Sequence, residues 1–187
     1  MSNIQIRQPA LPAVSEHFVK AHTPSRCLHL FKGVDSALLC LQNQAPSLGL
    51  IKRQYGDDFI VAYLALWIDN LNDFVNAVRK MNPSQIEETA VILFQEYYYF
   101  NLADINLVFR KIKKGEYGQL FAELDGVKIL GWFEQYARER AATAAGQSID
   151  QAAGFRQDLP RISNGSEKIK NRQAMGLHLQ QQAKTNP

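Results

Sequence analysis

Residues 101–140 read NLADINLVFRKIKKGEYGQLFAELDGVKILGWFEQYARER, and this stretch decides the fold. Apolar residues recur at helical spacing in both of its halves. They are Ile105, Val108, Phe109 and Ile112 in the first half, and Ile129, Phe133, Tyr136 and Ala137 in the second. Gly115 and the pair Asp125-Gly126 interrupt the pattern, as residues that end and begin helices do. We expect two core helices, although residues 119–124 and 127–131 could instead form a β-hairpin that turns at the Asp-Gly pair.

The connection between these helices is rich in positive charge. We call six of its residues the basic junction: Arg110, Lys111, Lys113, Lys114, Tyr117 and Lys128. Cations three and four positions apart on a helix lie side by side, where they can neutralise phosphates while an aromatic ring stacks on a base. The pattern therefore suggests a site for nucleic acid or for an acidic partner. The alternative is a solvated helix end, with cations that complement the helix dipole and a tyrosine that covers the core.

The preceding segment predicts two further core helices. Asp57 and Asp58 favour a helix start, and the apolar run Phe59–Ile68 suggests a helix that is buried on every side. The pattern then narrows to a stripe, which predicts one helix from Asp57 to about Lys80. The next helix starts either at Ser84, by a capping box with Glu87, or at Asn82 with Pro83 in the first turn. A further helix begins at Asn101 or Asp104.

Four consecutive aromatic residues, Tyr97 to Phe100, cannot all lie on one face of a helix. Tyr97 and Phe100 share a face, whereas Tyr98 and Tyr99 point elsewhere. Packing between helices is one interpretation of these rings. A stacking surface or a dimer contact that uses Tyr98 and Tyr99 is the other.

The ends of the chain differ from this body. Pro9 and Pro12 predict an extended lead-in over residues 1–14. Three short helices follow. Ser15 caps the first, and Pro24 opens the second, in which Cys27, Leu28, Leu30 and Phe31 point inward. Ser36 caps the third, over residues 37–44. Residues 141–187 lack a lasting apolar stripe, so we expect a largely disordered tail or a fragile helix. Cations and acids balance in residues 1–140, so the net charge of +3 comes from the tail. A basic tail can attract nucleic acid, or it can simply solubilise the protein.

These patterns together predict an all-α protein. We expect a compact bundle of about five to seven helices over residues 15–140, with a flexible C-terminal tail.

Nothing in the sequence marks a reaction or a cofactor. The histidines and the two cysteines, Cys27 and Cys40, lack the spacing of a metal site, and the pair Gly115 and Gly118 is not a phosphate-binding loop. We therefore expect no catalytic residue, no metal and no cofactor, and predict a protein that is not an enzyme. The longest apolar run is too short to span a bilayer and the first residues do not resemble a signal peptide, so a cytoplasmic protein without membrane contact is expected.

Residues 56–140 also resemble a known family. The resemblance is carried by AYLALWIDNLNDFVN, Glu96 to Tyr99, Asp104-Ile105, Lys113-x-Gly115-x-Tyr117-Gly118, Leu124 to Gly126 and Trp132 to Arg140. Met81-Asn82 and Gln85-Ile86 complete the set. The segment is similar to an uncharacterised family of small helical proteins from phages and mobile elements of anaerobic gut bacteria. The architecture is also loosely similar to small phage proteins that load or restrain replicative helicases. The resemblance implies work in replication, transfer or regulation of mobile DNA. The family has no established activity, so no catalytic role carries over to residues of this chain.

The function that we predict from these observations is that of a non-enzymatic accessory protein. It would serve DNA replication or mobile-element maintenance by binding DNA or a replication protein through the basic junction, with the tail adding affinity. The alternative is a protein–protein interaction module, a homodimer or an adaptor, that uses Tyr98 and Tyr99 and does not bind nucleic acid.

Overall fold

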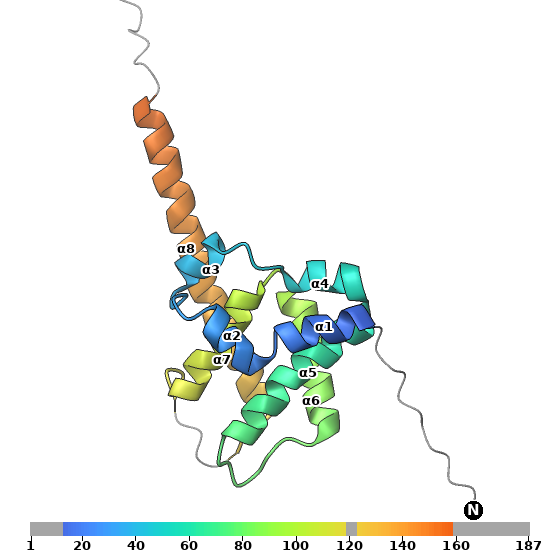
Figure 1. Cartoon of the computed structure of the whole chain (residues 1–187). Coiled ribbons are helices and arrows are strands. Elements are labelled where there is room, and N and C mark those ends of the chain that lie inside the picture. The colour runs from blue at the N-terminus through green and yellow to red at the C-terminus, as the bar shows by residue number, and fades with distance from the viewer. Residues whose placement is uncertain (1–12, 119–122, 159–187) are drawn as a thin grey trace, which may run out of the picture. The chain divides into compact units, whose positions relative to one another are not determined.

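The computed structural model describes residues 13–118 and 123–158 of the chain. This part is all helical, with eight helices and no β-strand (Figure 1). The helices are α1 (Ala13–Ala21), α2 (Pro24–Leu30), α3 (Ala37–Gln42), α4 (Leu48–Tyr55), α5 (Asp57–Phe74), α6 (Pro83–Tyr97), α7 (Leu102–Lys114) and α8 (Gly126–Asp158). The prediction of an all-α fold is confirmed, with one helix more than the range expected from the sequence.

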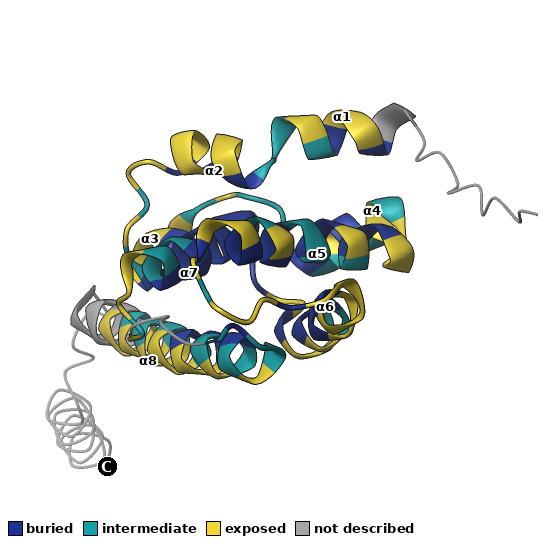
Figure 2. Ribbon diagram, turned by 90° about the horizontal axis from the view of Figure 1, so that it is seen from below, coloured by how far each residue is buried: buried dark blue, intermediate teal, exposed yellow. Residues whose placement is uncertain are grey.

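The chain divides into two units, Met1–Ala145 and Gly146–Pro187, and α8 runs across the division. In the first unit, α5 and α7 lie between a layer made of α1 and α2 and a layer made of α6 and the first part of α8 (Figure 2). Large rings from several helices fill this core, and Phe109 of α7 packs on both Trp67 of α5 and Phe133 of α8. The first half of α7 is buried on all sides, from Leu102 to Phe109.

Short polar side chains fix where the central helices begin. Asn82 and Asn101 start α6 and α7, and each forms a capping box with the residue three positions on. Asn82 therefore caps α6 with Pro83 in its first turn, which is the second of the two starts that the sequence allowed. Gly115 ends α7 in the left-handed conformation, at φ 75°, as predicted from its place after three lysines.

The N-terminal segments depart in part from expectation. Ser36 caps α3 as predicted, but Ser15 lies inside α1 and does not cap it. Leu28 and Leu30 are exposed, because α2 turns Cys27 and the adjacent Phe31 toward the core. Helix α4 was not predicted, and its N-cap is Ser47.

Helix α5 is shorter than the apolar stripe suggested. It ends at Phe74, and the predicted continuation to Lys80 is wrong. The amide side chain of Asn72 bonds to both backbone groups of Met81. Asn72 Nδ2 donates to the carbonyl of Met81 at 3.1 Å, and the backbone nitrogen of Met81 donates to Asn72 Oδ1 at 3.0 Å. These bonds hold the chain in a loop, which leaves Val78 86% exposed.

The connection into α8 follows the helical interpretation. Residues 126–131 are helical, so they do not form the second strand of a hairpin, and residues 119–122 lie outside the described part. Asp125 Oδ1 accepts a hydrogen bond from the backbone nitrogen of Lys128 at 2.8 Å, as expected of a cap. Helix α8 continues beyond Arg140 to Asp158, so the start of the predicted tail is helical. The rest of the tail and most of the predicted lead-in lie outside the described residues.

Candidate functional site

Helices α7 and α8 are held together by a buried ion pair. Asp104 is fully buried, and its carboxylate accepts hydrogen bonds from Arg140 Nε at 3.1 Å to each oxygen. The hydroxyl of Tyr136 donates to the same carboxylate at 2.6 Å, and the backbone nitrogen of Asn101 donates at 2.9 Å. Because every partner comes from α8 or the start of α7, this cluster fixes the two helices against each other.

Three cations of the basic junction point toward three different elements. Arg110 Nη2 donates to the carbonyl of Val34, between α2 and α3, at 2.6 Å. Lys111 Nζ pairs with Glu139 of α8 at 2.7 Å, and its side chain is 14% exposed. Lys113 Nζ donates to Asn70 Oδ1 of α5 at 2.6 Å. Burial lowers the pKa of Lys113. The three side chains therefore do not converge on one ligand.

The remaining members of the junction are also engaged, or lie apart. Lys128 Nζ donates to the carbonyl of Glu123 at 2.9 Å and lies 3.6 Å from the carboxylate of that residue. Lys114 is the most accessible of the cations, at 61%, and lies 3.6 Å from Glu116. The hydroxyl of Tyr117 is buried without a hydrogen-bond partner in the described part, and burial raises the pKa of Tyr117. That these six residues bind a partner stays a prediction, but the geometry gives no common cationic surface.

The aromatic run at the end of α6 divides as the sequence indicated. Tyr97 and Phe100 are buried, whereas Tyr98 is 56% and Tyr99 is 43% exposed. The two exposed rings, which we call the aromatic corner, meet edge to face with their centroids 5.8 Å apart.

The aromatic corner stands on a fixed backbone. The backbone nitrogen of Gly49 donates to the carbonyl of Tyr98 at 2.9 Å, and that of Leu48 donates to the carbonyl of Phe100 at 2.8 Å. The ring of Tyr99 packs edge to face on Phe100, and the guanidinium carbon of Arg140 lies 5.5 Å from its centroid. The ion pair between α7 and α8 therefore also supports one of the exposed rings.

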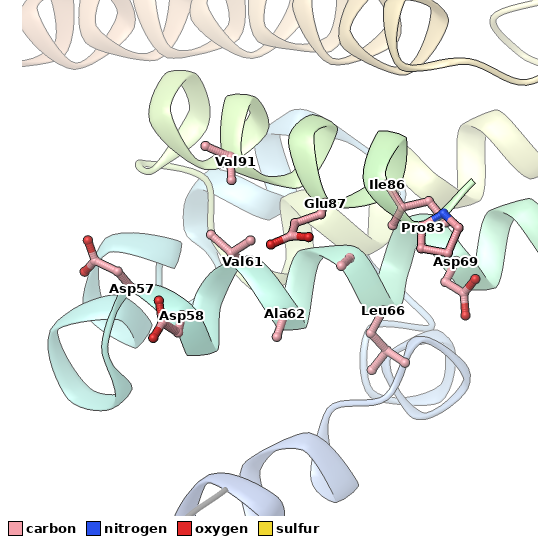
Figure 3. A pocket seen from close by; sticks show the side chains of 11 residues that line it. Asp57, Asp58, Val61, Ala62, Leu66, Asp69, Pro83, Ile86, Glu87 and Val91 are labelled. Atoms are coloured by element: carbon pink, nitrogen blue, oxygen red, sulfur yellow. The ribbon is translucent and has the colours of Figure 1, made fainter. Parts of the chain in front are cut away.

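An open groove of about 1120 Å³ runs between α5 and α6. Its lining combines apolar residues with four carboxylates: Asp57, Asp58, Val61, Ala62, Ala65, Leu66, Asp69, Pro83, Ile86, Glu87 and Val91. Figure 3 shows Asp57 and Asp58 at one end of the groove, Asp69 at the other, and Glu87 between them. We call this feature the α5–α6 groove.

Sequence reasoning missed this groove because it placed the whole run Phe59–Ile68 in the core. In the structure Phe59, Ile60, Tyr63, Leu64, Trp67 and Ile68 are buried, while the remaining four positions, 61, 62, 65 and 66, keep solvent contact. The signal was present in the small size of Ala62 and Ala65 and in the acids at both ends of the run. An apolar run with acidic ends also describes a buried helix, so the sequence alone could not separate the two cases.

Two other classes of site are missing from the described residues. No group of three or more histidine, cysteine, aspartate or glutamate side chains is placed to hold a metal ion in this part of the chain. None of its helices has the length and apolar character that a membrane span requires. No family model, curated protein or solved structure matches the chain.

Proposed function

We propose that this protein is a non-enzymatic interaction module that binds another protein through the aromatic corner. The observation that carries the proposal is a pair of exposed tyrosines, Tyr98 and Tyr99, on a turn whose backbone is hydrogen-bonded to the start of α4. Tyrosine is enriched among the residues that dominate binding energy at protein interfaces. Rings that are already held in place also lose little conformational freedom when a partner covers them.

The aromatic corner is a better candidate interface than the basic junction, because cations of the junction already have partners within the protein. A phosphate that approached Lys111 would have to displace Glu139, and one that approached Lys113 would have to displace Asn70. Such exchanges reduce the net gain of each contact, since one hydrogen bond is broken for each that forms. Lys114 is the cation most free to meet a phosphate, and a single contact gives weak binding.

We draw the class of partner from the sequence resemblance alone. It favours a protein of DNA replication or mobile-element maintenance, and contact with DNA would then pass through that partner. A homodimer through the same two rings is the competing arrangement.

The test is a pull-down from host lysate with the full chain, in the presence of nuclease. We expect the chain to capture one protein, and we expect this capture to persist after nuclease treatment. A Y98A/Y99A variant should capture the same protein at least about tenfold more weakly. The control is V127A, which also removes exposed apolar surface, because Val127 is 80% exposed. Val127 lies about 20 Å along α8 from Arg140, the residue of that helix that contacts the Tyr99 ring, so the control removes apolar surface far from that contact.

Each alternative has its own outcome in this experiment. If the wild-type chain lost its capture after nuclease treatment, the result would indicate that the protein binds DNA. Equal capture by wild type and Y98A/Y99A would reject the aromatic corner. Sedimentation of a dimer that Y98A/Y99A converts to a monomer would identify the partner as a second copy.

A further inference from the structure

The α5–α6 groove has a floor that the described fold leaves uncovered. Val61, Ala65 and Leu66 of α5 keep solvent contact, and Ala62 is exposed. Pro83, Ile86 and Val91 of α6 extend the same apolar surface. An apolar strip of this kind between two helices is the shape that receives the apolar face of a third helix.

The charges around this floor have one sign. Asp57 pairs with Lys52 at 3.1 Å, whereas Asp58, Asp69 and Glu87 have no partner within the described ranges. Among the described residues, no cation lines the groove. An occupant should therefore be positively charged at its edges, and anionic partners such as nucleic acid or an acidic lipid surface should be repelled.

The spacing of the carboxylates separates a helix from a small cation. Asp58 and Asp69 lie eleven residues apart on one continuous helix, which corresponds to about 16 Å along its axis. Carboxylates so far apart cannot converge on one metal ion, whose ligands lie within about 2.6 Å of it. They match a partner helix of about three turns, with apolar residues on the face turned to the groove and cations along its sides.

We infer that the α5–α6 groove is a docking site for a basic amphipathic helix of a partner protein. Leucine-like side chains of that helix rest on the floor between Val61 and Val91, and its lysines or arginines meet Asp58, Asp69 and Glu87. The inference is independent of the aromatic corner, because the two surfaces share no residue. With both surfaces occupied, the protein joins two partners.

The test uses the full chain and a synthetic probe, a helical peptide of about fifteen leucines and lysines with the leucines on one face. Binding is followed by fluorescence anisotropy at physiological ionic strength. We expect the probe to bind the wild type, and a peptide of the same composition in scrambled order to bind at least about tenfold more weakly, because it cannot present an apolar face.

Two variants of the groove separate its charge from its floor. D58N/D69N/E87Q should weaken probe binding about tenfold, while the control D35N/E96Q/E134Q removes the same charge outside the groove and should change binding by less than about twofold. A62K places bulk and positive charge at an exposed position of the floor, and should also weaken binding about tenfold. Y98A/Y99A should leave probe binding unchanged, so the two proposals fail separately.

Several results would overturn the inference. They are no binding of the probe to the wild type, equal binding of the scrambled peptide, and an equal loss in the groove variant and its charge-matched control. Self-association of the wild type that D58N/D69N/E87Q abolishes would assign the groove to a second copy of this chain and not to a partner protein.

Discussion

The fully buried carboxylate of Asp104 depends on few groups for its charge balance. Arg140 supplies the only cationic partner that pairs with it in the described residues, and the side chain of Arg140 is itself 16% exposed. We expect R140A to lower the free energy of unfolding by about 3 kcal/mol, because it leaves an uncompensated charge in the core. Urea unfolding followed by circular dichroism measures the change.

A second arginine of α8, two positions earlier in the chain, provides a matched control for this prediction. Arg138 pairs with Glu134, but both side chains are exposed, so R138A should cost less than about 1 kcal/mol. Equal effects of R138A and R140A would mean that the buried pair adds nothing beyond a surface contact. Y136F removes only the hydroxyl that donates to Asp104. Its loss in free energy of unfolding should lie between those of R138A and R140A, at about 1 to 2 kcal/mol.

At the scale of elements, the end of α5 depends on the side chain of Asn72. This amide is buried and satisfies both backbone groups of Met81, which closes the loop between α5 and α6. We expect N72A to destabilise the protein by about 2 kcal/mol, because two buried backbone groups lose their partners. Urea unfolding measures the loss. N76A, at an exposed position in the same loop, should change stability by less than about 0.5 kcal/mol. If the two variants behave alike, Asn72 does not hold the loop.

The elements show which parts of the fold a sequence can predict. Caps and glycine stops act within one turn, so the local pattern predicted Ser36 and Gly115, and it gave Asn82 as one of two possible starts of α6. The end of α5 was missed, because the bonds between Asn72 and Met81 connect residues nine positions apart and override an apolar stripe that would continue the helix. The start of α4 was missed although Ser47 caps it locally, and a long-range hydrogen bond from the backbone nitrogen of Leu48 to the carbonyl of Phe100 also fixes it.

At the scale of the whole molecule, the candidate site was only partly predictable. The division of Tyr97 to Phe100 into buried and exposed rings follows from helical geometry, and the structure confirms it. The dispersal of the basic junction does not follow from sequence, because Glu139 and Asn70 reach Lys111 and Lys113 only through tertiary packing. The same holds for the α5–α6 groove, which exists because no described element covers one side of α5.

Stability of the whole molecule should fall in alkaline solution, because its core holds groups that resist ionisation. Burial raises the pKa of Cys27 and of Cys40 from 9.0 to about 11, and that of Tyr97 from 10.0 to about 12. Between pH 9 and 11 the unfolded chain therefore releases thiol protons that the folded chain keeps, which favours unfolding. The contribution of these thiols to the free energy of unfolding is complete below pH 9 and is lost as the pH rises to 11. Tyr97 adds to the loss of stability above pH 10. Urea unfolding at a series of pH values should show this decline. C27A/C40A, although less stable at neutral pH, should decline less steeply between pH 9 and 10, whereas an identical slope in the two proteins would show that the thiols ionise equally in both states.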